Sequence, residues 1–207
     1  FAASLQWLPQ RIQNWLQILS LRIQIGRYRD YGLPEPNFLP TQAHPTVNSE
    51  ILDKIRHGKI HPRSGIESIA GHRVYFTDGT SSEYDVIIAA TGYTINFPFF
   101  DRNFIDWGEA KHIPLYLRVF HPEHSSLFFV GLIQPQGCIW TLTEAQSYLI
   151  AQYLIGKAQL PSNWREQAAR EGEYWANQFI TRPRHSLEVH YYPYLKKLQQ
   201  MSAGKSA

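Results

Sequence analysis

The sequence predicts an α/β protein, and three features of it lead to that expectation. Residues 86–90 form a continuous apolar run that ends at Thr91 and Gly92, the pattern of a strand buried on both faces of a parallel sheet. Residues 127–130 form a second short apolar run, followed by a glycine-bounded loop over residues 131–137. Apolar residues at helical spacing come directly after this loop and predict a helix.

Composition limits the classes of protein to which the chain can belong. Its 207 residues suffice for one large domain or two small ones, and 43% apolar with 18% charged residues is typical of a globular protein. The net charge of +3 is spread along the chain, so we expect no nucleic-acid partner. Cys138 is the one cysteine and no secretory signal is visible, which favours a cytoplasmic protein. We expect Cys138 itself to be a small apolar filler rather than an activated thiol.

A first helix is expected over residues 5–25, where apolar residues form one stripe. Pro9 should end or kink its first turn. Arg11, Arg22 and several glutamines argue against a transmembrane span. Two interpretations remain for this helix: packing on the rest of the protein, which we favour, and lying on a membrane surface.

The next elements are expected to be short. Residues 31–48 contain four prolines and predict an extended connector. A short helix should follow, with Ser49 as its N-cap and Gly58 at its C-terminal end. Residues 74–76 alternate between apolar and polar positions, and Asp-Gly at 78–79 marks a tight turn, so a β-hairpin is expected there.

A longer helix is predicted over residues 141–155. Thr141 and Glu144 have the spacing of a capping box, and Gly156 should end the helix. The side chains expected to face inward are Leu142, Ala145, Leu149 and Tyr153. The remainder should be mostly helical, with a break at residues 182–183, where proline follows arginine.

The strand end at Thr91 and Gly92 is the strongest candidate for a ligand site. In open α/β sheets, ligands bind at the carboxyl ends of strands. Gly92 would let the backbone turn and approach a cofactor closely, while Thr91 offers a hydroxyl and a backbone amide. The alternative is a plain strand-to-turn junction without a ligand.

The loop of residues 131–137 is the second candidate. It precedes a helix N-terminus, where unpaired amides and the helix dipole favour electron-rich groups. Gln136 and Gly137 lie at the point where the loop enters the helix. The alternative is an ordinary capped helix.

Three motifs in order give the chain a family resemblance. They are V-x-F-x-D-G at residues 74–79, A-T-G-Y at residues 90–93 and F-P-F at residues 97–99. This combination resembles the C-terminal half of flavin-containing monooxygenases, over residues 28–198. The resemblance implies the C-terminal portion of a two-dinucleotide-binding-domain (Rossmann-like) flavoprotein with added helices. Residues 1–92 would end the NADPH-binding domain, with inserted helices and return strands, and residues 93–207 would be the C-terminal part of the FAD-binding domain.

The resemblance also implies a reaction and cofactor contacts. NADPH would reduce FAD, O2 would add to the flavin as a C4a-hydroperoxide, and a small nitrogen or sulfur nucleophile would take one oxygen atom. Thr91 and Gly92 would lie against FAD, Gln136 would hydrogen-bond the isoalloxazine, and the helix start after Gly137 would face its pyrimidine end. His185 could line the nicotinamide or substrate side.

The sequence departs from the family in one respect. No two glycines are separated by one residue, so neither G-x-G-x-x-G fingerprint is present. Because the chain also begins with Phe1, we expect a fragment without activity of its own. The alternatives are a Baeyer–Villiger or reductase-type flavoenzyme, or a non-catalytic remnant that packs on a partner or membrane. His121 and His124 lack a clear third ligand, so no metal site is expected.

Overall fold

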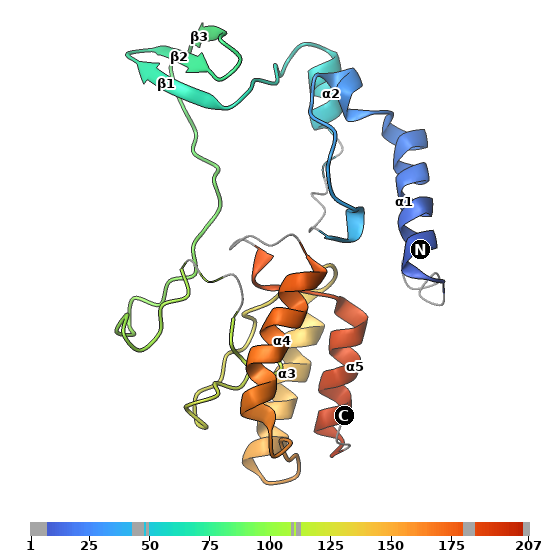
Figure 1. Ribbon diagram of the computed structural model, residues 1–207, viewed down its shortest axis with the longest axis vertical. Helices are drawn as coiled ribbons and strands as arrows, with labels where there is room; N and C mark the ends of the chain where they lie inside the picture. Colours follow the sequence, from blue (N-terminus) through green and yellow to red (C-terminus); the bar gives the residue numbers. More distant parts are fainter. Residues whose placement is uncertain are drawn as a thin grey trace. The chain divides into compact units, whose positions relative to one another are not determined.

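The computed structural model describes residues 8–42, 48, 50–108, 110, 113–179 and 185–204. The chain forms two compact units, each of which is described by itself (Figure 1). The N-terminal unit comprises residues 1–37 and 46–92, and the C-terminal unit comprises residues 38–45 and 93–207. Helices and sheet strands both occur, as expected for the α/β class.

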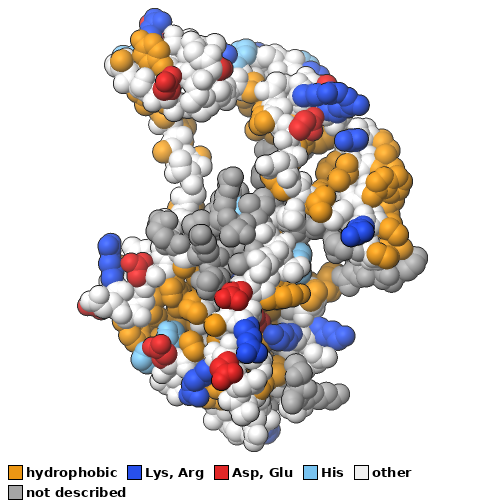
Figure 2. Space-filling model, in the orientation of Figure 1, with side chains coloured by type: hydrophobic (Ala, Val, Ile, Leu, Met, Phe, Trp, Pro, Cys, Tyr) orange, Lys and Arg blue, Asp and Glu red, His pale blue; other side chains and the backbone are white. Residues whose placement is uncertain are grey.

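Helix α1, Gln10–Ile25, opens the described part of the N-terminal unit. Pro9 occupies the N-cap, where its missing N–H is harmless, so the proline sets the start of the helix rather than kinking it. Figure 2 shows hydrophobic side chains gathered over α1, and those that are exposed are Ile12, Trp15, Leu19, Leu21 and Ile23. The described residues of the N-terminal unit do not cover this stripe, and its packing on the rest of the protein stays a prediction. No helix among them is long and apolar enough to cross a membrane.

Short helices follow α1. The 3-10 turn η2, Tyr28–Tyr31, leads into the predicted connector, and a second one, η3 at Pro40–Gln42, lies within it. Helix α2 spans Ile51–Arg56, and the side chain of Asn48 accepts the amides of Glu50 and Ile51 at 2.9 and 2.7 Å. Asn48 therefore satisfies the first amides of α2. Ser49, the expected cap, lies outside the described residues.

The predicted hairpin is confirmed within a three-stranded antiparallel sheet. Its strands are β1 at Ile66–Ala70, β2 at Arg73–Phe76 and β3 at Ser81–Glu83, in that order. Val74 and Phe76 are buried, as the alternation indicated. Asp78 accepts both the amide and the hydroxyl of Thr80, and these bonds lower the pKa of its carboxyl.

The predicted buried strand over residues 86–90 is wrong in this structure. Residues 86–90 belong to no strand and are exposed, with Val86 at 74% and Ile88 at 84% of full exposure. An interior strand needs a hydrogen-bonded neighbour on each side. Among the described residues, no strand pairs with this run.

Among its described residues, the C-terminal unit contains three α-helices: α3 at Ile139–Leu154, α4 at Trp164–Gln178 and α5 at Tyr191–Ser202 (Figure 1). Their apolar faces share one core. Leu142 and Leu149 of α3 are fully buried as predicted, while Ala145 and Tyr153 are half-buried. The predicted break at residues 182–183 lies outside the described residues.

The predicted capping box is wrong, because α3 begins earlier than expected. Its N-cap is Cys138, so Thr141 and Glu144 lie inside the helix. The predicted end is confirmed: the C-cap is Ile155, and Gly156 follows with a left-handed φ of 74°.

The second predicted strand, residues 127–130, is also not formed as a regular strand. Its amides join an irregular hairpin with residues 119–121: the Phe129 N–H donates to the Val119 carbonyl at 2.9 Å, and Phe120 pairs with Phe128 through a single bridge. Only Phe129 is buried, while Val130 is 49% exposed. The local pairing takes the hydrogen bonds that a longer strand would need.

Candidate functional site

The loop of residues 131–137 is fixed to the protein in its middle and at its start. Strand β4, Gln134–Pro135, pairs in parallel with β5, Glu188–Val189, in a two-stranded sheet. The Gln134 amide also donates to the Leu187 carbonyl at 2.7 Å. At the start of the loop, Gly131 has a φ of 79°, and its amide donates to the side-chain oxygen of Gln146 at 2.9 Å.

Gln146 belongs to a chain of buried hydrogen bonds. Its side-chain amide donates to the Tyr194 hydroxyl at 2.7 Å, and that hydroxyl donates to the Leu117 carbonyl at 2.6 Å. Gln146, Tyr194 and Leu117 are all fully buried. Burial raises the pKa of Tyr194 far above its usual value, so the hydroxyl keeps its proton.

Leu117 and Arg118 form a strained turn. Their φ angles are 51° and 55°, and the Val119 amide closes the turn onto the Tyr116 carbonyl at 3.0 Å. Two positive φ angles are typical of a type I′ turn, which normally takes Asn or Gly. The Leu117 amide donates to Glu171 of α4 at 2.8 Å, which holds the turn in place.

The guanidinium of Arg118 is buried, and few hydrogen bonds compensate for its removal from water. Its Nε and Nη1 have no hydrogen-bond partner among the described residues, and the residue is 1% exposed. Burial lowers the pKa of Arg118 to about 10, and the charge of Glu171 opposes that shift. Glu171 also accepts the Lys197 ammonium at 3.1 Å and the Trp175 indole N–H at 3.4 Å. The Glu171 carboxylate therefore binds the Leu117 amide, the Lys197 ammonium and the Trp175 indole at the same time.

The start of α3 is open to solvent. Cys138 is exposed, so the expectation of an apolar filler is wrong. The amide and hydroxyl of Thr141, with the amide of Trp140, lower the pKa of the Cys138 thiol. The first turn of α3 carries no acidic side chain, so the positive end of its dipole is not neutralised there.

The four predicted cofactor residues fall into two pairs. Thr91 and Gly92 are exposed at the end of the N-terminal unit. Gly92 has a φ of 89°, and a Cβ atom added to it would lie within 4 Å of no described residue apart from its two chain neighbours. Gln136 is half-buried and Gly137 exposed in the C-terminal unit. A Cβ on Gly137 would lie 2.9 Å from the Tyr191 ring, so packing by Tyr191 explains this glycine without a cofactor.

His185 lies in a buried cluster that the sequence did not indicate. Its ring is hydrogen-bonded to Glu188 of β5, and both side chains are buried. The second carboxylate oxygen of Glu188 and the hydroxyl of Ser186 have no partner among the described residues. The sequence spacing of His185 and Glu188 alone could not have shown that both are enclosed.

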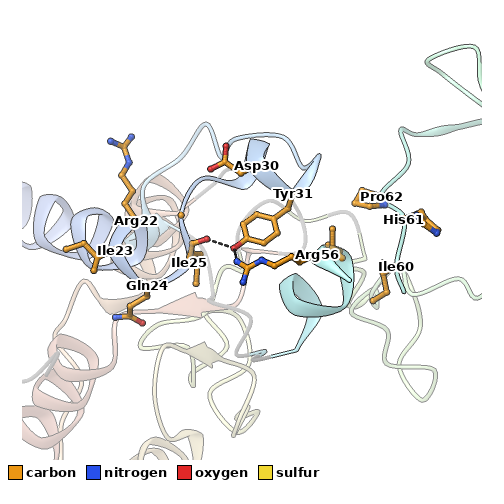
Figure 3. Close-up of a pocket in the computed structure, with 12 residues that line it drawn as sticks. Arg22, Ile23, Gln24, Ile25, Asp30, Tyr31, Arg56, Ile60, His61 and Pro62 are labelled. Atoms are coloured by element: carbon orange, nitrogen blue, oxygen red, sulfur yellow. Dashed lines mark hydrogen bonds between the residues drawn. The ribbon is translucent and has the colours of Figure 1, made fainter. Parts of the chain in front are cut away.

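Two other features do not form convergent sites. His121 and His124 have ring centroids 4.9 Å apart, and the described residues contain no group of three potential metal ligands. A cavity of about 690 Å³ lies in the N-terminal unit around Tyr31 and Arg56 (Figure 3). The Arg56 guanidinium donates to the Tyr31 hydroxyl at 2.6 Å, and Figure 3 shows Arg22 directed away from that contact.

Comparison with known proteins gives the family. Residues 2–207 match the flavin-binding monooxygenase-like family. The chain belongs to this family. It is 30% identical to rat dimethylaniline monooxygenase (N-oxide-forming) 2, with 92% of the chain and 36% of the relative covered. It is 34% identical to 4-hydroxybenzoate brominase (decarboxylating) of Marinomonas mediterranea, with 75% and 30% covered. It is 27% identical to rat flavin-containing monooxygenase 5, with 94% and 39% covered. The chain spans about a third of the length of these relatives.

The electron-rich edge of an isoalloxazine is stabilised by positive charge and hydrogen-bond donors. The start of α3, next to Gln136, carries the positive end of the helix dipole, and no acidic side chain in the first turn neutralises it. The start of α3 therefore suits the electron-rich edge of a flavin, whereas packing against Tyr191 accounts for Gly137.

Proposed function

We propose that this chain is the C-terminal part of an NADPH- and FAD-dependent monooxygenase that acts on small nitrogen or sulfur nucleophiles. The observation that carries the proposal is the family match over residues 2–207, which includes both candidate cofactor segments. The relatives named as monooxygenases align with 92% and 94% of the chain. When bound and reduced by NADPH, the flavin supplies the activation of O2. We place the protein in the cytoplasm.

The two units correspond, in this proposal, to two parts of a Rossmann-like flavoprotein. Residues 1–92 complete the NADPH-binding domain, and residues 93–207 complete the FAD-binding domain. Support comes from the boundary of the compact units, which falls after Gly92, although residues 38–45 group with the C-terminal unit.

The chain's own residues would bind and orient FAD rather than react. Thr91 and Gly92 would let the backbone run close along the cofactor. Gln136 would hydrogen-bond the isoalloxazine, and the start of α3, after Gly137, would stabilise negative charge on the ring. The catalytic residues are not assigned.

A second candidate function is halogenation of an aromatic acid. The Marinomonas relative at 34% identity is named a decarboxylating brominase. Product analysis separates the two functions. The full-length protein would be incubated with NADPH, O2 and bromide, first with a tertiary amine and then with 4-hydroxybenzoate. Formation of an N-oxide supports the proposal, while a brominated phenol supports the second candidate.

Gln136 provides the residue-level test. In the full-length protein, Gln136→Ala should weaken FAD binding by about 0.5–1.5 kcal/mol, because one hydrogen bond is lost. Gln134→Ala is the control, since Gln134 lies on β4 in the same loop with an exposed side chain. Equal changes in the FAD dissociation constant for both variants would remove Gln136 from the site.

A further inference from the structure

We propose that Gln146 and Tyr194 are positioning residues that hold the loop of residues 131–137 in the conformation that receives the flavin. Their anchor is the turn at Leu117 and Arg118. The inference deepens the proposed function and rests on it, because it assigns the flavin to this loop.

The first link joins the start of the loop to the helix that follows its end. The loop runs from Gly131 into the N-cap of α3 at Cys138. Gln146 lies about two turns further along that helix and accepts the Gly131 amide at 2.9 Å. Helix α3 therefore holds both ends of the loop, one through the chain and one through a side chain. A displacement of Gln146 would move the start of the loop relative to the helix N-terminus.

The second link fixes which way the Gln146 amide points. The Leu117 carbonyl can only accept, so the Tyr194 hydroxyl must give it its single proton. The Tyr194 oxygen is then an acceptor and takes the Gln146 NH2 group at 2.7 Å. The Gln146 carbonyl must consequently face the Gly131 N–H group, which can only donate. Backbone groups at both ends thus determine the direction of every bond between them.

The third link shows why the Leu117 end does not give way. Leu117 has a positive φ and is fully buried, and its amide is bonded to Glu171 of α4 at 2.8 Å. A backbone in a sparsely populated conformation persists only when its surroundings over-determine it. The network therefore connects the loop to α3, to α5 through Tyr194 and to α4 through Glu171.

The test uses full-length holoprotein with two variants that remove one link each. Tyr194→Phe removes one oxygen atom, and Gln146→Leu removes both polar groups at similar size. The matched controls are Tyr192→Phe on α5, where the side chain is 45% exposed, and Gln152→Leu on α3. The FAD dissociation constant, the flavin absorbance spectrum and the melting temperature of the apoprotein would be measured for each.

We expect each network variant to raise the FAD dissociation constant by about two- to tenfold, as for one lost hydrogen bond, and to shift the flavin absorbance bands. The controls should change neither. The double variant should be no worse than the worse single variant, because the two links act in series.

A purely structural role gives a different result. The network variants would then melt at lower temperature but bind FAD with the wild-type constant and spectrum, and the proposal would be wrong. Should Gln146→Leu fail to fold, Tyr194→Phe decides, since it leaves the packing in place. If the wild-type protein itself binds no FAD, the proposed function is wrong. If the wild-type protein binds FAD and the network variants bind it equally well, only the present inference is wrong.

Discussion

The two candidate cofactor segments differ in how the chain supports them. Residues 86–92 carry the stronger sequence motif, yet Ile88 is 84% exposed and the run belongs to no strand. Residues 131–137 carry the weaker motif, yet a strand pairing and a buried side chain fix them. An apolar run indicates the environment that a segment needs, and only other segments can supply that environment.

The largest effect should come from the unsupported segment. In the full-length protein, Gly92→Val should give protein that folds poorly or purifies without flavin. A Cβ at a φ of 89° costs roughly 1–2 kcal/mol, and a side chain there would occupy the space proposed for FAD. Thr91→Ser should be milder, because it keeps the hydroxyl and the amide. The ratio of flavin to protein absorbance measures the effect.

Gly79 provides a matched control for the strain alone. It also has a positive φ, 79°, and nothing within 4 Å of a built Cβ, but it lies in the hairpin turn. Gly79→Val should therefore retain flavin. Full flavin occupancy in Gly92→Val would show that this turn does not touch the cofactor.

The same contrast explains which sequence predictions succeeded. The hairpin was predictable because its strands and its Asp78–Gly79 turn are adjacent in sequence. The start of α3 was not, because Cys138 at the end of a tethered loop, rather than Thr141, begins the helix. The Gln146–Tyr194–Leu117 chain joins residues far apart in sequence, and no local pattern marks such a network. Gln136 and Gly137 were located correctly at the helix entry, but their contact with flavin stays a prediction.

Within the supported region, Glu171 should matter most for stability. Glu171→Gln removes the buried charge that faces Arg118, so we expect a loss of about 3 kcal/mol in the free energy of unfolding. Glu173→Gln is the control, since Glu173 lies on the same helix and is exposed. Denaturant midpoints of the full-length protein would measure both. A loss below about 0.5 kcal/mol for Glu171→Gln would show that Arg118 is compensated elsewhere.

Substitution of Gly137 should affect stability in a way that substitution of Gly92 does not, because the group next to Gly137 is a side chain of the protein rather than the proposed cofactor. Gly137→Ala should destabilise the protein by about 1–3 kcal/mol through overpacking against the Tyr191 ring, with or without FAD. Combining it with Tyr191→Ala should cost less than the sum of the two single changes. Additive losses in the denaturant midpoint would contradict the steric explanation.

The smallest effect concerns Cys138, which can report whether the start of α3 faces the flavin. The Thr141 amide and hydroxyl lower the pKa of the Cys138 thiol, so more thiolate is present at a given pH than for a free cysteine. The alkylation rate of the apoprotein should therefore rise with pH to a midpoint below the free-thiol value of about 8.5. Thr141→Val keeps the amide but loses the hydroxyl, and should move the midpoint part of the way back.

Bound FAD should slow alkylation of Cys138 at every pH, because the ring would cover the loop beside Cys138. Equal rates for apoprotein and holoprotein would place the flavin away from this helix, and a midpoint at the free-thiol value would show that the Thr141 groups do not reach the sulfur.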